Sequence, residues 1–191
     1  MPASVATKLY AAADVIAANG LASTKIEDIA KASGVPKATL YYYFSGKDQI
    51  LAFLLKDSLA ALAGEVARAA DAPGAGRDRL VAVINVQVEH TMHRPGFCRA
   101  LVGDLSHAIR LPELAVAVQQ AFYDPITRVL QAGAADGSLR TLADPSSDAI
   151  SIFGAVMMTA MLHNVIDTDR GEGEVAAGVI DLVMKGLAPS A

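Results

Sequence analysis

The sequence has no tryptophan, one cysteine in 191 residues, and charged residues at only 19% of positions. One thiol cannot build a framework of intramolecular disulfides. A chain of this length buries roughly 70% of its unfolded surface on folding, so it needs neither disulfides nor a structural metal for a core. Low charge combined with 53% hydrophobic residues excludes intrinsic disorder as the main state. The chain therefore forms one large domain or two small ones.

Basic residues are also scarce. The chain has 16 Lys and Arg against 20 Asp and Glu, for a formal net charge of -4. A protein that binds polyanions without specificity carries long blocks of Lys and Arg, so any contact with nucleic acid must be local. The mean hydropathy of +0.36 is high. It predicts that some apolar surface is buried in a subunit interface or lines a cavity.

Signals for export are missing at the amino terminus, because the first residues carry no charged n-region and Lys8 and Asp14 interrupt any apolar h-region. The stretch 149–166 is uncharged and just long enough to span a membrane. Acidic residues flank it, and no cluster of Lys or Arg does, unlike a typical membrane anchor. We expect a helix buried inside protein, no membrane partner, and a cytoplasmic location associated with the nucleoid.

No segment alternates polar and apolar residues as a strand does, whereas apolar residues recur at helical spacing almost throughout. This pattern predicts an all-α protein. The clearest linker is 71–76, and beyond it about five helices are expected to form a bundle. The expected breaks between these helices are 94–96, 111–112, 136–138, 144–145 and 169–171. Pro125 lies within a helical pattern, where we expect a kink rather than a stop.

The first fifty residues predict a helix-turn-helix. A first helix ends at Asn19-Gly20, a short helix stops at Ser33-Gly34, and a second short helix runs over 36–44 from a proline that suits a first turn. Two capping boxes are expected. Thr24 would pair with Glu27 before the first short helix, and 45–48 would form a variant before a longer helix.

The second short helix is the candidate reader of the DNA major groove. With Leu40 at the centre of its buried face, steps of 100° place Pro36 and Phe44 beside it. The side chains that point outward or lie on the flanks are then Lys37, Ala38, Thr39, Tyr41, Tyr42 and Tyr43. Three successive tyrosines offer hydroxyls to phosphates and base edges. The alternative is that two of these tyrosines are packing residues and the lysines form a solvated face.

These residues resemble the DNA-binding domain of the tetracycline-repressor (TetR) family of bacterial transcriptional regulators. The resemblance rests on Thr24–Ala30, on Gly34–Phe44 and on Lys47-Asp48. It implies an all-α fold with an N-terminal three-helix DNA-binding domain over 1–48 and a C-terminal effector-binding and dimerisation bundle over 49–191. The implied function is that of a one-component repressor, which a small-molecule effector releases from a palindromic DNA operator.

The resemblance also implies roles for single residues. Lys37, Ala38, Thr39, Tyr42 and Tyr43 would approach base edges. Tyr41 and Lys47 would hold phosphates, with Thr24 and Lys25 as a second phosphate set. The sequence departs from the family in two ways, since Pro36 replaces a usual Ser or Thr cap and the basic amino-terminal arm is missing. Residues 1–57 hold six lysines, five acidic residues and no arginine, so bidentate reading of guanine by arginine is excluded for this helix, and a dimer must strengthen binding.

The stretches 149–166 and 174–187 are expected to pair with those of a second copy in a symmetric four-helix interface. The alternative is a helix buried within a single subunit. An effector cavity is expected in the same domain, where adaptable and aromatic side chains are candidates to line it. They are Phe97, Phe122, Tyr123, Phe153, Met157, Met158 and Met161. Ordinary core packing is the alternative for each of them.

His90 and His93, beside Glu89 and followed by Cys98, form the metal-like cluster of the sequence. Zinc needs three or four converging ligands, and the Pro95-Gly96 pair separates the two halves of this set. A nucleophilic Cys98 with His93 as its base lacks a third, orienting residue. We therefore expect no enzyme activity, no cofactor and no metal. The rival hypothesis is a small-molecule-binding helical protein, or an enzyme that uses these residues, with a vestigial DNA-binding module.

Overall fold

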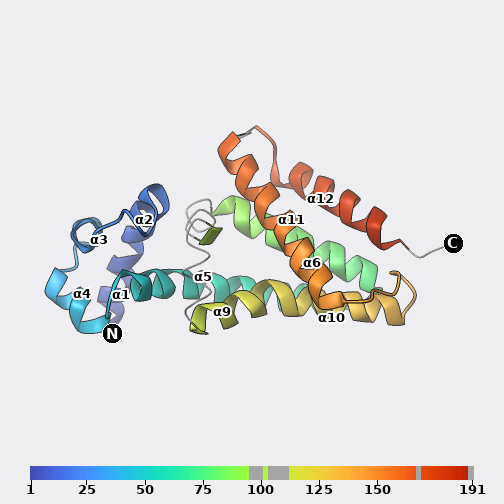
Figure 1. Cartoon of the computed structure of the whole chain (residues 1–191), viewed down its shortest axis with the longest axis horizontal. Helices are drawn as coiled ribbons and strands as arrows, with labels where there is room; N and C mark the ends of the chain where they lie inside the picture. Colours follow the sequence, from blue (N-terminus) through green and yellow to red (C-terminus); the bar gives the residue numbers. More distant parts are fainter. Residues whose placement is uncertain (95–100, 103–111, 167–168, 189–191) are drawn as a thin grey trace. The chain divides into compact units, whose positions relative to one another are not determined.

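The computed structural model describes residues 1–94, 101–102, 112–166 and 169–188, and every regular element within these ranges is a helix (Figure 1). This confirms the all-α class. The chain divides into two compact units, which we call unit 1 and unit 2. Unit 1 comprises Met1–Ser58 and Gly96–Val116, and unit 2 comprises Leu59–Pro95 and Ala117–Ala191.

The described part of unit 1 is built mainly from short helices. Its elements are α1 (Ala3–Leu9), the 3₁₀ turn η1 (Tyr10–Ala12), α2 (Ala13–Asn19), α3 (Ile26–Ser33), α4 (Lys37–Tyr43) and the first part of α5 (Lys47–Ala70). Its core consists of fully or almost fully buried aliphatic side chains, among them Leu9, Ile16, Leu21, Ile29, Val35, Leu40 and Ile50. Gly34 follows α3 with φ +65° in the left-handed region, which glycine adopts without steric cost. The helix-turn-helix expected from the sequence is therefore present.

The prediction of a capping box between Thr24 and Glu27 is wrong. α3 begins at Ile26, and the backbone N–H of Lys25 donates to Asp28 Oδ2 at 3.0 Å. Thr24 is buried and its hydroxyl donates to the carbonyl of Gly20 at 2.7 Å. Because this local bond holds Thr24 in the turn, the helix starts one residue later than expected and the third helical residue is Asp28.

Two further details of unit 1 differ by a small shift in register. α5 begins at Lys47, so Gln49 rather than Asp48 reaches back, and its Oε1 accepts from the Ser45 N–H at 2.9 Å. Pro36 precedes α4 with an extended backbone (φ -58°, ψ 141°) and is exposed. Because Pro36 is not yet helical, it lies off the helical wheel, and its placement beside Leu40 on the buried face is wrong.

Unit 2 is a helical bundle centred on α6. Its elements are the remainder of α5, α6 (Gly76–His93), the end of α9 (Pro112–Val118), the π-helical turn η2 (Gln119–Tyr123), α10 (Asp124–Ala135), α11 (Pro145–Ile166) and α12 (Glu172–Leu187). α6 packs against α10, α11 and α12 (Figure 1). The linker at 71–76 and the breaks at 136–138, 144–145 and 169–171 lie at the junctions between helices, as the sequence predicts, with Gly76 and Pro145 as the first residues of α6 and α11.

The helical path continues past Pro125, as expected, and the π-helical turn lies directly before it. Proline has no N–H for the carbonyl four residues earlier, which here belongs to Ala121. The side chain of Gln87, from α6, donates to that carbonyl at 3.2 Å. A π-turn before proline and a buried side-chain donor together accommodate the interruption.

The helix α11 carries an apolar face that unit 2 does not cover. By length and composition alone, its stretch Pro145–Asn164 is apolar enough to cross a membrane, and 33% of that stretch is buried. Ile150, Met158 and Leu162 are 55%, 43% and 43% exposed, and Leu182 on α12 is 68% exposed. Exposed apolar side chains of this kind are typical of protein–protein interfaces.

Candidate nucleic-acid interface and ligand domain

The helix α4 turns one side inward and presents its tyrosines to solvent. Leu40 is 1% exposed, whereas Tyr41 and Tyr42 are 59% and 80% exposed. The rings of Tyr42 and Tyr43 contact each other edge to face, with centroids 4.9 Å apart, and Tyr43 is half-buried. This contact limits the orientations of both rings. The exposed hydroxyl of Tyr42 is therefore partly fixed in position.

The other residues expected to reach DNA from α4 are also accessible. Lys37 and Ala38 are exposed, and Thr39 is half-buried. Lys37 forms an ion pair with Glu27 on α3. Their hydrogen bond raises the pKa of Lys37 and lowers the pKa of Glu27. The ammonium of Lys37, at the start of the candidate reader helix, is therefore paired with the carboxylate of Glu27, which weakens its attraction to phosphates.

Lys47 connects α5 to the loop before α3. Its Nζ donates to the carbonyls of Ala22 at 2.8 Å and of Thr24 at 3.2 Å. An ammonium has three donors, so one N–H is left for a phosphate. Thr24 is 1% exposed and its hydroxyl is already bonded, whereas the neighbouring Lys25 is exposed. Lys25 is thus more accessible than Thr24 as a phosphate contact from this region.

The aromatic residues expected to line an effector cavity come together in unit 2. The ring of Phe153 contacts Phe122 and Tyr123 at centroid distances of 4.7 and 5.0 Å. Burial raises the pKa of Tyr123. Met157 is buried beside them on α11, Met161 is half-buried, and Met158 lies on the exposed apolar face. Phe97 lies outside the described residues.

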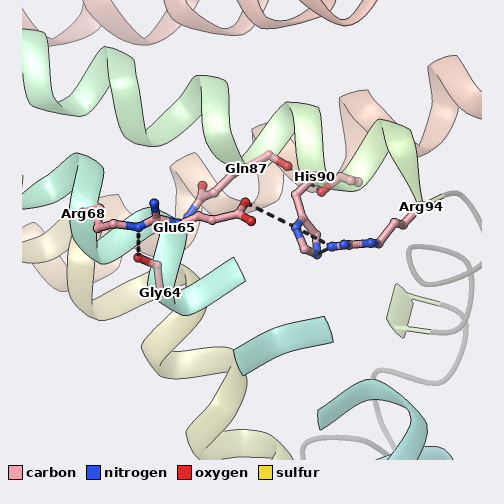
Figure 2. A network of polar contacts seen from close by, with 7 residues as sticks. Gly64, Glu65, Arg68, Gln87, His90 and Arg94 are labelled. Atoms are coloured by element: carbon pink, nitrogen blue, oxygen red, sulfur yellow. Dashed lines mark hydrogen bonds and ion pairs between the residues drawn. The ribbon is translucent and has the colours of Figure 1, made fainter. Parts of the chain in front are cut away.

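A polar cluster that the sequence analysis missed lies between α5 and α6 (Figure 2). His90 is 5% exposed, and its Nδ1 lies 3.7 Å from Glu65 Oε2, whereas its Nε2 lies 2.6 Å from Nη1 of Arg94. Burial, followed by the nearby Arg94 charge, lowers the pKa of His90. His90 is therefore held in an environment that favours the neutral imidazole.

Gln87 lies one turn before His90 on α6 and is fully buried. Its Nε2 donates to the carbonyl of Ala121, but its Oε1 has no hydrogen-bond partner in the described part of the chain. An unpaired buried acceptor is costly, and such groups are concentrated at functional sites. The sequence signal was present, because Gln87 interrupts the apolar spacing of Val83, Ile84 and Val88, but spacing alone does not tell whether a partner exists.

The structure separates the histidines of the expected metal-like cluster. His90 turns inward to Glu65, whereas His93 points to Glu172 on α12, with Nε2 and Oε2 2.8 Å apart. Glu89 lies on the same side of α6 as His93, and Cys98 lies outside the described residues. His90 and His93 therefore have different partners and do not converge on one site.

Each unit also has a surface hollow. In unit 1 a cavity of about 370 Å³ is lined mainly by Tyr43, Phe44, Phe53, Lys56 and Leu114. In unit 2 a more open hollow of about 610 Å³ lies between α5 and the α10 region, along Ala63, Gly64, Ala67 and Pro125. The first hollow reaches the end of the candidate reader helix.

A solvent-facing helix held on a tight glycine turn against a preceding helix is the arrangement of helix-turn-helix DNA-binding proteins. Residues 9–53 match the model of the bacterial regulatory proteins of the tetR family. The helix-turn-helix region of unit 1 is therefore similar to the regulatory proteins of this family.

Two relatives and one solved structure give the extent of the similarity. The HTH-type transcriptional repressor KstR2 of Mycolicibacterium smegmatis is 27% identical over 138 residues, 69% of this chain and 65% of that protein. The fatty acid metabolism regulator protein of Bacillus subtilis is 43% identical over 49 residues, 26% of this chain and 25% of that protein. The structure of FadR from Bacillus subtilis in complex with stearoyl-CoA has a TM-score of 0.80 at 21% identity, covering 94% of this chain and 98% of that one.

Proposed function

We propose that this protein is a homodimeric, one-component transcriptional repressor of the bacterial cytoplasm, which binds a palindromic DNA operator and leaves it when a small-molecule effector binds. The observation that carries the proposal is α4, whose outer side presents Tyr41 and Tyr42 while Leu40 anchors it. Hydroxyls on rigid rings bond phosphates and base edges, and the rings contact thymine methyls.

Dimerisation compensates for the weak charge of each DNA-binding module. Two modules double the electrostatic attraction, and their fixed spacing adds specificity for two half-sites. The exposed apolar side chains of α11 and α12 support an interface between two copies of this chain, because a symmetric interface brings the same patch of both subunits together. The same patch accounts for the membrane-like composition of α11.

We further propose an apolar effector of the fatty acyl or ketosteroid class. One relative is named for fatty acid metabolism, the KstR2 of Mycobacterium tuberculosis is described as a ketosteroid transcriptional regulator, and the FadR structure contains stearoyl-CoA. The side chains proposed to contact it are Phe122, Tyr123, Phe153, Met157 and Met161, with Gln87 as a polar contact. Gln87 Oε1 accepts only, so the effector group beside it would carry an O–H or N–H. Effector binding would favour the dimer geometry that does not fit the operator.

The proposal is tested by gel shift with DNA from immediately upstream of the protein's own gene. Purified full-length protein should shift this DNA and protect a pseudo-palindrome in a footprint, and stearoyl-CoA or a related acyl-CoA should release it. Failure to bind any site in a genome-wide selection of DNA fragments would remove the repressor function. DNA binding that no acyl-CoA or ketosteroid changes would remove only the proposed effector class.

A further inference from the structure

We propose that Glu89, His93 and Glu172 form a binding site for a zinc-like divalent ion on unit 2. One ligand atom from each of the three residues lies within 4.8 Å of the other two. His93 Nε2 and Glu172 Oε2 are already 2.8 Å apart. An ion would bind between these two atoms and draw in the carboxylate of Glu89.

The ligands come from two helices that are packed against each other. Glu89 and His93 are four residues apart near the end of α6, so their side chains lie on one face of the helix. Glu172 is the first residue of α12, which packs against α6. A site that takes two ligands from one helix and the third from a packed neighbour is largely formed before the metal arrives.

The charge and chemistry of the three groups favour a cation of a particular class. Within the described ranges neither Glu89 nor Glu172 pairs with a lysine or an arginine, and Glu172 pairs with His93. Imidazole nitrogen with carboxylate oxygen is a ligand set of zinc and similar transition metals, whereas calcium and magnesium take oxygen ligands. All three residues are at least partly exposed, so water can fill the remaining coordination position.

The ion would fasten the end of α6 to the start of α12. The unfolded chain does not hold these three ligands together, so the ion would bind only the folded chain. The free energy of unfolding of unit 2 would therefore rise with metal concentration. This role is independent of the proposed repressor function, and it needs neither DNA nor an effector.

The test is titration calorimetry of the chelator-treated full chain with zinc chloride, together with thermal unfolding with and without zinc. The wild type should bind one zinc per chain and unfold at a higher temperature in its presence. His93→Gln and Glu172→Gln should each weaken binding by about tenfold or more. Both are surface changes, and circular dichroism would verify that each variant is folded.

Two control variants make the outcome specific. Glu174→Gln removes an exposed carboxylate from the same turn of α12 and should leave zinc affinity within about twofold, and Cys98→Ser should do the same. Absence of stoichiometric zinc binding by the wild type would overturn the assignment. So would binding that Cys98→Ser abolishes while His93→Gln leaves it unchanged, because the thiol would then be the ligand.

Discussion

Gly76 and Gly133 meet backbone to backbone in unit 2, so closely that a Cβ placed on Gly76 would collide with the Cα of Gly133. The contact brings the start of α6 against α10. Asp136 secures it, because its Oδ2 accepts from the Gly76 N–H at 2.7 Å. The hydrogen bonds that Asp136 accepts here and from Ser138 lower its pKa. The packing of α6 on α10 therefore depends on the absence of a side chain at Gly76, whereas a Cβ on Gly133 would meet the side chain of Leu139.

Gly76→Ala should destabilise the protein by about 3 kcal/mol, because the added methyl group meets backbone that cannot move aside. The matched control is Gly64→Ala within α5, where an added Cβ has nothing within 4 Å. That variant should be neutral or more stable by about 0.5–1 kcal/mol, since alanine favours the helix. Urea unfolding followed by circular dichroism measures both, and equal stability of the two variants would contradict the close contact.

Tyr42→Ala should weaken operator binding by about tenfold or more while leaving stability within about 0.5 kcal/mol, because the side chain is 80% exposed. Tyr42→Phe keeps the ring and removes the hydroxyl, so it separates the two contributions. Fluorescence anisotropy with labelled operator gives the affinities. Unchanged affinity in Tyr42→Ala would exclude Tyr42 from the residues that read DNA.

Lys47→Ala should lower the free energy of unfolding by about 1 kcal/mol, because the carbonyls of Ala22 and Thr24 lose a charged donor that water replaces only in part. Lys31→Ala, an exposed lysine on α3, is the stability control. If the third N–H of Lys47 holds a phosphate, the variant also lowers the salt slope of operator binding by about one unit. An unchanged slope with reduced stability would make Lys47 a positioning residue only.

Stability should fall as the pH drops below about 6.5, the ordinary pKa of histidine, and His90 should contribute to that fall. Its pKa is lower in the folded protein, so the unfolded chain binds the proton more readily and acid favours unfolding. The charged or titratable groups acting on its ring are Glu65, Arg94 and His93. The stability difference between wild type and His90→Gln should shrink from pH 7.5 to pH 5.5 in urea unfolding. A difference that is constant with pH would contradict this.

Leu182→Lys should convert the proposed dimer into monomer, because it places a charge on the apolar face of α12. Val116→Lys on α9 changes a side chain that is also more than half exposed, and it serves as the control that stays dimeric. Light scattering at micromolar protein concentration distinguishes the two states. A monomeric wild type would exclude the dimer. A Leu182→Lys variant that stays dimeric would place the interface elsewhere.

Local features of the fold followed from the sequence because they depend on neighbouring residues. The glycine at 34, the apolar spacing around Leu40 and the breaks at 136–138 and 144–145 act through backbone preference and burial within a few positions. The capping errors at Thr24 and Asp48 were one-residue shifts, which spacing does not resolve once a side chain such as Thr24 finds another partner.

By itself, the sequence determined the helical class and the second helix of the helix-turn-helix with its outward tyrosines, and it placed His90 and His93 beside Glu89. Only the tertiary structure decided what these groups meet. Glu172 joins His93 from α12, Lys47 reaches back to Ala22, and Gln87 bonds Ala121 but leaves its own oxygen without a partner in the described residues. Each of these contacts joins residues more than twenty positions apart, and local periodicity carries no information about contacts that arise only when distant helices pack.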